Sequence, residues 1–254
     1  MILATDIGNS NIVFGGIENG KVLFTSRLAT DISRLADEYA TYILGIFELY
    51  NVDKFGFDGA IISSVVPPLS SVLAKTVERV TGKKPLILGP GIKTGLNIRT
   101  NNSGELGSDI VANNVAALEL YKGPVIVIDM GTATTVSVSD AESNFLGCAI
   151  MPGITTSLRA LTKKAALLQD IDLEAPSTSI CTNTPDSLKA GIVFGTAAAI
   201  DGMIDRFTKD LGYKTNVVAT GGHAQYIIPY CKSEIVLNPD LLLMGLNIIY
   251  NKNI

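Results

Sequence analysis

The sequence predicts a duplicated α/β fold made of two halves of similar size. The first observation is a motif that occurs twice, as DIGNSN at residues 6–11 and as DMGTATT at residues 129–135. Each copy follows an apolar run typical of a buried strand and precedes a second β-branched run. The second observation is their spacing, because the copies begin at residues 6 and 129 of a 254-residue chain. This spacing predicts domains at residues 1–118 and 119–254, with a cleft between them.

Each half is predicted to begin with a strand hairpin and to continue with alternating helices and strands. Helix starts are indicated by Pro67-Pro68 and by Pro185, since proline is favoured in the first helical turn. In the first half we expect strands at 2–4, 11–17, 21–28, 59–63 and 86–88 and helices at 32–50, 67–81 and from about 108. In the second half we expect strands at 125–128, 134–139, 145–150 and 217–219 and helices from about 155, at 185–211 and at 239–250.

Composition indicates a globular protein and excludes several classes of function. With 47% hydrophobic and 17% charged residues, the chain can bury a large core. A net charge of -4 without clustered Lys and Arg argues against nucleic-acid binding. No apolar run reaches the roughly 18 to 20 residues of a membrane span, so no membrane association is expected. The three cysteines show no metal or redox spacing, which predicts a cytoplasmic location.

The repeated motif has a chemistry that suits a phosphate ligand. A glycine beside small hydroxyl or amide side chains lets backbone N–H groups approach a phosphate closely. The aspartate before the glycine cannot bind phosphate directly, but it can hold a cation that does. The alternative is an ordinary hairpin turn, in which Asn and Gly are common.

The order of short motifs along the chain resembles that of type III pantothenate kinase. This family belongs to the superfamily of acetate kinase, sugar kinases, Hsp70 and actin. The resemblance therefore implies a duplicated actin-like ATPase (ribonuclease H-like) fold with a nucleotide in the cleft. It also implies that ATP phosphorylates pantothenate, the first step of coenzyme A biosynthesis. The motifs are DIGNSN at 6–11, GSD at 107–109, DMGTATT at 129–135, MPGI at 151–154, NT at 183–184 and TGG at 220–222.

By this resemblance the first hairpin binds the ATP phosphates. Backbone N–H groups and short polar side chains would form the phosphate site, and Asp6 would hold hydrated Mg²⁺. The residues implied in nucleotide binding are Asp6, Ile7, Gly8, Asn9, Ser10, Asn11, Ile12 and Val13.

The second hairpin is implied to contact the same nucleotide. Asp129 would bind a monovalent cation, K⁺ or NH₄⁺, and Thr132 would contact a phosphate of ATP. Such a cation offsets phosphate charge that Mg²⁺ leaves uncovered. The alternative is that the threonine run is only β-branched strand sequence, which suits Thr134 and Thr135 better than Thr132.

The central GSD motif is implied to bind pantothenate and to supply the general base, Asp109. We expect Asp109 at the start of a helix, where the helix dipole would lower the pKa of its carboxyl. Orienting the hydroxyl matters more than basicity for a loose phosphoryl-transfer transition state. The alternative is that Ser108 or Asp109 is only the helix cap. The substrate residues implied in this segment are Thr100, Gly107, Ser108, Asp109 and Ile110.

Thr184 stands before Pro185, a pattern that predicts Thr184 as a helix N-cap. The resemblance implies that Thr184 also contacts pantothenate from the partner subunit of a homodimer. The helix that follows carries Gly191, Gly195 and Ala199 at four-residue steps. This stripe predicts close helix packing, either within the chain or across the dimer.

Residues 221–223 are further candidates for the site. Gly221 and Gly222 follow a strand and suit a close backbone approach to the adenosine part of ATP, or a plain turn into a helix. His223 is the only histidine, and we interpret it as a polar residue at a helix start rather than a catalytic group.

The chain departs from the family pattern at the pantothenate end. Ile110 stands where the family usually has an arginine, and Thr100 stands where it usually has a tyrosine. An arginine is the natural bidentate partner of the pantothenate carboxylate, and Arg99 is the nearest replacement. The sequence leaves three functions open: an active pantothenate kinase, which we favour, a noncatalytic nucleotide-binding regulatory relative, and a kinase for another small hydroxylated acceptor.

Overall fold

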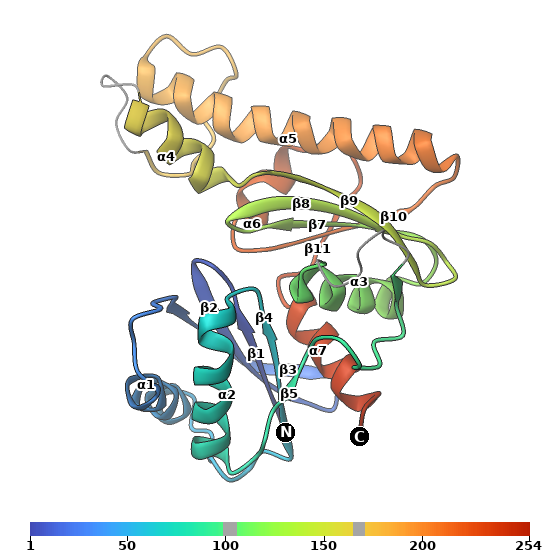
Figure 1. Cartoon of the computed structure of the whole chain (residues 1–254). Helices are drawn as coiled ribbons and strands as arrows, with labels where there is room; N and C mark the ends of the chain where they lie inside the picture. Colours follow the sequence, from blue (N-terminus) through green and yellow to red (C-terminus); the bar gives the residue numbers. More distant parts are fainter. Residues whose placement is uncertain (99–105, 165–170) are drawn as a thin grey trace. The chain divides into compact units, whose positions relative to one another are not determined.

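The computed structural model describes residues 1–98, 106–164 and 171–254, and its elements follow the predicted order (Figure 1). Element ends differ from the prediction by no more than about four residues, which is the usual accuracy of boundaries read from sequence. Three short elements were not predicted: β6 (Asn97–Ile98), the 3₁₀ helix η2 (Ile228–Tyr230) and β11 (Val236–Leu237).

Two compact units divide the chain. Unit 1 contains Met1–Glu119 and Asp240–Ile254, and unit 2 contains Leu120–Pro239. The elements up to the end of the first repeat are β1 (Ile2–Ile7), β2 (Asn11–Glu18), β3 (Lys21–Ala29), α1 (Ala36–Leu49), β4 (Gly59–Ser64), α2 (Pro67–Thr81), β5 (Leu86–Ile87), β6 and α3 (Ser108–Tyr121). Those that follow are β7 (Val125–Met130), β8 (Ala133–Ser139), β9 (Asn144–Pro152), α4 (Ile154–Lys164), α5 (Thr184–Leu211), β10 (Asn216–Thr220), α6 (Ala224–Ile227), η2, β11 and α7 (Leu241–Asn251).

The two units contain the same five-strand arrangement. In unit 1 the order is β3-β2-β1-β4-β5, with an antiparallel hairpin β1–β2–β3 and parallel pairs β1–β4 and β4–β5. In unit 2 the order β9-β8-β7-β10-β11 repeats this pattern strand for strand. The predicted duplication is therefore present at the level of strand pairing, with β1 equivalent to β7 and β4 equivalent to β10.

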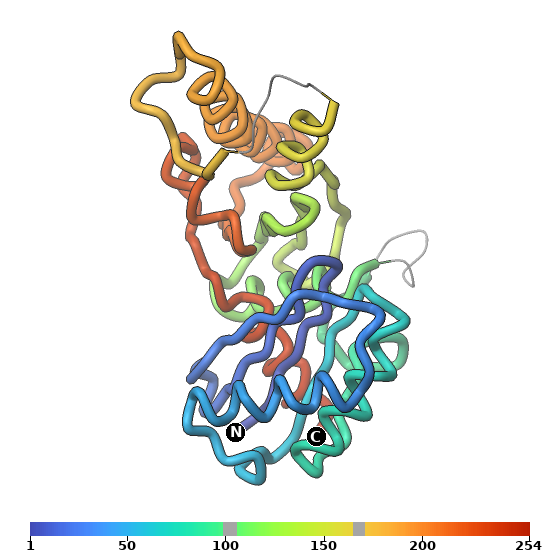
Figure 2. The backbone as a smooth tube through the Cα atoms, turned by 90° about the vertical axis from the view of Figure 1, so that its left-hand side faces the viewer, coloured from blue at the N-terminus to red at the C-terminus, as the bar shows by residue number. Residues whose placement is uncertain are grey.

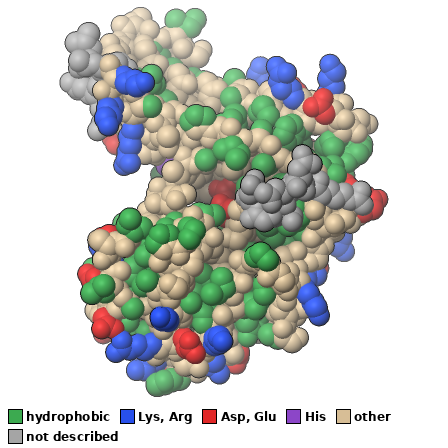
Figure 3. Space-filling view, viewed as in Figure 1, with side chains coloured by type: hydrophobic (Ala, Val, Ile, Leu, Met, Phe, Trp, Pro, Cys, Tyr) green, Lys and Arg blue, Asp and Glu red, His purple; other side chains and the backbone are tan. Residues whose placement is uncertain are grey.

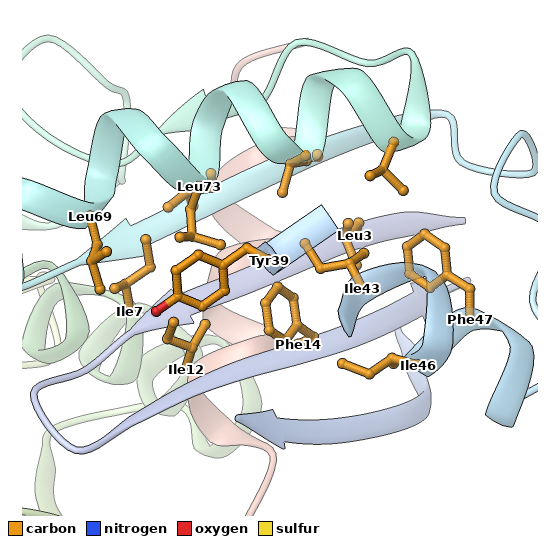
Figure 4. Packing of buried hydrophobic residues seen from close by; sticks show 14 of the residues in the cluster. Leu3, Ile7, Ile12, Phe14, Tyr39, Ile43, Ile46, Phe47, Leu69 and Leu73 are labelled. Carbon is orange, nitrogen blue, oxygen red and sulfur yellow. The ribbon is translucent and has the colours of Figure 1, made fainter. Parts of the chain in front are cut away.

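The core of unit 1 lies between its sheet and the helices α1 and α2 (Figure 4). Strand residues alternate between two faces, so Leu3 and Ile7 of β1 point to the same side. They meet Tyr39 and Ile43 of α1 and Leu73 of α2, all of which are fully buried or nearly so. Figure 4 shows these side chains interdigitating between the helices and the sheet. This packing fixes β1 at the centre of the unit.

The other face of the unit 1 sheet is covered by α7, a segment that the sequence predicts to lie in the second domain. Figure 2 shows this last segment of the chain among the elements of the first unit. Close packing is possible because two strand positions on this face are glycines. A side chain at Gly15 would collide with Leu243 of α7, and one at Gly59 would collide with Tyr250. The apolar sequence of α7 predicts burial, but it does not specify which sheet the helix covers.

The core of unit 2 is formed by its sheet together with α4, α5 and α6. Among the described helices, α5 alone is long and apolar enough, by length and composition, to cross a membrane. One such helix is weak evidence for a membrane span, because a core helix passes the same test. One side of α5 does supply Ile192, Val193, Ala197 and Ile200 to the unit 2 core.

Gly245 gives a test of the packing between α7 and α3. A Cβ at this position would overlap the Ala112 carbonyl of α3, so Gly245→Ala has to push the helices apart. We expect a loss of about 1 to 3 kcal/mol in the free energy of unfolding, the usual cost of overpacking. The measurement is chemical denaturation of both proteins followed by circular dichroism.

Gly45→Ala is the matched control, because Gly45 lies within α1 of the same unit with open space around its Cβ position. Replacing an exposed helix glycine with alanine should stabilise the protein by about 0.5 to 1 kcal/mol. A Gly245→Ala protein as stable as the Gly45→Ala protein would show that α7 does not pack closely on α3.

Candidate active site

The first candidate segment is the turn between β1 and β2. The strands end and begin at Ile7 and Asn11, and the Gly8 N–H closes the turn by donating to the Asn11 carbonyl at 3.0 Å. A Cβ on Gly8 would lie 3.0 Å from that carbonyl oxygen, so the tight turn favours glycine. Asn9 and Ser10 at the tip are exposed. Of the other residues predicted to bind nucleotide, Ile12 is fully buried in the core and Val13 is partly buried.

Asp6 lies at the end of β1 and is largely buried, with 9% of its surface exposed. In the parallel pairing of β1 with β4, Asp6 is aligned with Ser63. Side chains at aligned positions of neighbouring strands point to the same face, about 5 Å apart. Asp6 and Ser63 therefore share the C-terminal edge of the two strands, the usual location of ligand sites in open α/β sheets.

Ser108 attaches the start of α3 to this edge. Its hydroxyl lies 2.9 Å from the hydroxyl of Ser63, accepts the Ser64 N–H at 3.0 Å and donates to the Ser64 carbonyl at 3.1 Å. The hydroxyl thus bonds to the end of β4, which tethers the first residue of α3 to the strand next to β1. The sequence predicted Ser108 as a cap or a substrate residue and did not anticipate this role.

Asp109 is the next residue, and its position depends on this attachment. The Ile110 N–H donates to Asp109 Oδ1 at 2.8 Å. Burial raises the pKa of the Asp109 carboxyl above its ordinary value, and hydrogen bonds from the Ile110 and Asp109 N–H groups only partly oppose this rise. The sequence predicts a pKa lowered by the helix terminus, and that direction is wrong because desolvation is the larger effect.

A side chain at Gly107 would displace the Asp109 carboxylate from its position. A Cβ there would overlap Asp109 Oδ1 and would also contact Val65 at 3.7 Å. The glycine therefore allows the carboxylate to fold back against the backbone that precedes α3. The three residues of the GSD motif act together. Ser108 attaches the start of α3 to β4, and Gly107 leaves space for the carboxylate of Asp109.

Ile110 is buried, with 8% of its surface exposed, and its carbonyl accepts a hydrogen bond from the Asn114 side chain at 2.9 Å. An apolar side chain offers no partner for a substrate carboxylate. Arg99, the expected replacement, and Thr100, a predicted substrate residue, both lie outside the described residues.

The second candidate segment is the β7–β8 turn of unit 2. Asp129 occupies the position equivalent to Asp6, and it is aligned with Thr220 of β10 as Asp6 is with Ser63. Gly221 follows with φ +93°, and a Cβ there would lie 2.7 Å from Asp129 Oδ1 and 2.6 Å from the Met130 nitrogen. Packing against the β7 end therefore accounts for a glycine at 221 without any ligand.

Thr132 is exposed at the tip of this turn. Its carbonyl accepts the Gly153 N–H at 3.2 Å and the Thr156 hydroxyl at 2.7 Å, so the start of α4 holds the turn in place. Thr134, in contrast, is buried within β8. This difference agrees with Thr134 as a strand residue and leaves the Thr132 side chain at the surface.

His223 also contributes to this arrangement. Its N–H donates to the Met130 carbonyl at 3.2 Å, and its Nε2 lies 3.0 Å from the Thr155 hydroxyl. His223 precedes α6, in agreement with its interpretation as a helix-start residue. Its ring connects this start to the beginning of α4.

The N-terminus of α5 differs by one residue from the prediction. Asn183, not Thr184, is the N-cap: its Oδ1 accepts the Asp186 N–H at 2.9 Å, and its Nδ2 donates to the Asp186 carboxylate at 2.7 Å. Thr184 is the first helical residue and is exposed. Its side chain is therefore not needed to cap the helix.

The distribution of His, Cys, Asp and Glu side chains limits how a metal ion could be bound. Among residues 1–98, 106–164 and 171–254 there is no group of three or more His, Cys, Asp or Glu side chains that could hold a metal ion. A single buried carboxylate such as Asp6 does fit Mg²⁺, which usually keeps several waters and takes one or two carboxylates together with substrate phosphates.

On the face seen in Figure 3, Lys and Arg side chains of the described residues occur singly or in small groups.

Comparison with known proteins shows the family to which this chain belongs. A family model described as type III pantothenate kinase matches residues 2–206. The type III pantothenate kinase of Exiguobacterium sibiricum is 39% identical over 253 residues, which cover the full length of both chains.

Two solved structures share the fold. A conserved putative Baf family transcriptional activator from Campylobacter jejuni has a TM-score of 0.63 at 22% identity, with 99% of this chain and 98% of that chain covered. A putative 2-dehydro-3-deoxygalactonokinase from Sinorhizobium meliloti has a TM-score of 0.56 at 11% identity, with 99% and 96% covered. At these identities the likeness shows the fold alone. It confirms the predicted duplicated fold of actin-like ATPases and sugar kinases.

Gly107→Ala tests how the Asp109 carboxylate is held. The added Cβ must displace Oδ1, and because the carboxylate is the end of a side chain, it can turn outward while the helix stays in place. Leaving the buried position removes the main cause of the raised pKa, so we expect the Asp109 pKa to fall toward its ordinary value. The measurement is an NMR titration of the Asp109 side-chain carbon.

Gly89→Ala is the control, since Gly89 lies in a loop of the same unit with nothing near its Cβ position. It should leave the Asp109 pKa unchanged. An Asp109 pKa that stays equally raised in Gly107→Ala would contradict the packing described here.

Proposed function

This chain belongs to the type III pantothenate kinase family, and from that premise we propose that it transfers the γ-phosphate of ATP to the primary hydroxyl of pantothenate. The product is 4'-phosphopantothenate, and the reaction is the first step of coenzyme A biosynthesis. The structural observation that carries the proposal is the buried Asp109 carboxylate, tethered through Ser108 to the strand that lies beside Asp6.

Asp109 has the chemistry of a base for this transfer. The pantothenate hydroxyl oxygen would attack the γ-phosphorus as the bond to the bridging oxygen of ADP breaks. The hydroxyl proton would pass to Asp109, whose raised pKa makes it a better proton acceptor than an exposed aspartate. Gly107 leaves space for this carboxylate and Ser108 attaches the start of its helix to β4. Orientation of the hydroxyl is the main requirement of a loose transition state.

The β1–β2 turn would bind the ATP phosphates through its backbone N–H groups and the short side chains of Asn9, Ser10 and Asn11. Asp6 would hold the hydrated Mg²⁺, which neutralises phosphate charge during transfer when it is bound. The β7–β8 turn would add Thr132 as a phosphate contact and Asp129 as the ligand of a monovalent cation, K⁺ or NH₄⁺.

Recognition of pantothenate would involve Gly107, Ser108 and Ile110, together with Thr100. Thr184 of a second subunit would complete the site, which requires a homodimer. The exposed Thr184 side chain, released from capping by Asn183, supports this role. We place the enzyme in the cytoplasm and assign it no nucleic-acid or membrane partner.

The test is an acceptor panel. Purified protein is incubated with Mg-ATP and K⁺ and with pantothenate or other small hydroxylated acceptors, and ADP release and product mass are measured. We expect turnover of pantothenate. Turnover of a different acceptor only would change the substrate, and nucleotide binding without any turnover would favour the regulatory alternative.

Asp109→Asn is the matched variant in this experiment. It should bind ATP and lose about 10² to 10⁴ in turnover, the usual contribution of a positioned base. A loss below about threefold would reduce Asp109 to a structural residue at the helix start.

The same variant should be at least as stable as the parent at pH 7. A raised folded pKa means that the stability gained from the protonated carboxyl is fully present below pH 3.8, the unfolded value, and is lost as the pH rises through the folded pKa. Asn carries no charge at any pH. The difference in stability between the variant and the parent should therefore shrink as the pH falls from the folded pKa of Asp109 toward 3.8. Thermal unfolding at several pH values measures this difference.

The two turn aspartates should respond to different cations. Asp6→Asn should lower turnover in a way that excess Mg²⁺ partly restores, because the carboxylate holds that ion. For Asp129 we expect low activity in Na⁺ or Tris buffer, a saturable rise with K⁺, and loss of that response in Asp129→Ala. Steady-state rates across Mg²⁺ and K⁺ titrations measure both effects. Equal rates in all salts, or an unchanged Mg²⁺ dependence of Asp6→Asn, would remove the corresponding assignment.

A further inference from the structure

Thr30 lies just after β3 and contacts the β1–β2 turn across the sheet. Its hydroxyl donates to the Gly8 carbonyl at 2.6 Å, and its N–H donates to the Ser10 carbonyl at 3.0 Å. Both hydrogen bonds come from one residue, and both end on carbonyl oxygens of the turn. Thr30 is not part of the repeated motif, and neither the resemblance nor the residue pattern assigns it a role.

These two hydrogen bonds determine which way the peptide groups of the turn face. The described residues contain no cis peptide bond. In a trans peptide the carbonyl and the following N–H point in opposite directions. Because the Gly8 and Ser10 carbonyls point to Thr30, the N–H groups of Asn9 and Asn11 point away from it. An anion is attracted by N–H groups and repelled by carbonyl oxygens, so Thr30 determines on which side of the turn a phosphate can bind.

Thr30 is itself held by the core of unit 1. The neighbouring residue, Asp31, makes two hydrogen bonds to the Tyr39 hydroxyl. The Asp31 carbonyl accepts from this hydroxyl at 2.8 Å, and the Asp31 N–H donates to the hydroxyl oxygen at 3.3 Å. The Tyr39 side chain is fully buried beside Ile7 and Ile12, which flank the turn (Figure 4). The backbone at Thr30 therefore cannot move away from the turn without breaking hydrogen bonds to a core residue.

We propose that Thr30 is a positioning residue for phosphate binding: its hydroxyl holds the Gly8 carbonyl back and directs the Asn9 N–H toward the phosphates of ATP. The inference rests on the proposed function, because it takes ATP as the ligand of the turn. Thr30 acts through the turn and makes no contact with the nucleotide.

The test is Thr30→Val, which keeps the shape of the side chain and removes only the hydroxyl donor. Thr30→Ser restores the donor and should restore the parent behaviour. Thr25→Val is the matched control, because Thr25 lies in β3, the strand that ends just before Thr30, and its hydroxyl is 3.5 Å from Asp240, far from the turn in sequence. Thermal unfolding of all three variants shows whether each is folded.

Steady-state kinetics separate positioning from a general structural effect. For Thr30→Val we expect KM for ATP to rise by about 3- to 10-fold, the usual worth of one hydrogen bond, with KM for pantothenate unchanged. Tripolyphosphate and adenosine, each used as a competitive inhibitor, divide ATP into its two parts. The inhibition constant of tripolyphosphate should rise with KM for ATP, while that of adenosine should stay constant.

A KM for ATP within twofold of the parent would overturn the proposal, as would equal weakening of tripolyphosphate and adenosine. A Thr30→Ser protein as impaired as Thr30→Val would overturn it as well. Calorimetric titration with tripolyphosphate distinguishes this inference from the proposed function. If the parent phosphorylates no acceptor yet binds tripolyphosphate more tightly than Thr30→Val does, the function fails and the role of Thr30 in anion binding stands.

Discussion

The parallel pairing of β1 with β4 is the constraint on which the unit 1 site depends. It aligns Asp6 with Ser63 at the C-terminal edge of the sheet, and Ser63 and Ser64 together receive the hydroxyl of Ser108. A change of one residue in this register would turn Ser63 to the opposite face and separate α3 from the strand end. The register is fixed in turn by the core, since the alternate residues Leu3 and Ile7 of β1 pack against α1 and α2.

The same edge concentrates buried polar groups at a cost to stability. Asp6 is largely buried, and burial raises the pKa of Asp109, so the folded protein disfavours the charged form of that carboxyl. The hydrogen bonds of Ser108 attach the start of α3 to the end of β4, next to the buried Asp109 carboxyl. Shifted carboxyl pKa values are frequent at functional sites, so the raised pKa of Asp109 supports its proposed role.

Local patterns predicted the fold well because they act over short distances. Apolar and β-branched runs predicted the strands, Pro67-Pro68 predicted the start of α2, and the repeated motif predicted both turns. What the sequence could not give depends on distant partners. The register across β3 brings Thr30 to the turn, and glycines on two strands decide which sheet α7 covers. The cap of α5 was placed one residue late because Asn and Thr are both good N-caps, and only geometry shows whose oxygen reaches the Asp186 N–H.

The burial of Ile110 bears on how catalysis and acceptor recognition are divided. The Asp109 carboxylate is held by the Ile110 backbone N–H and by the space at Gly107, and neither contact involves the side chain at 110. Under the proposed function, a substitution at 110 would change the surroundings of the acceptor carboxylate and leave the proposed base, Asp109, in place. The arginine that the resemblance implies at 110 is therefore not needed to form the GSD arrangement. The Ile110 side chain is buried in the protein, so under the proposed function the carboxylate of pantothenate would need a partner from another segment.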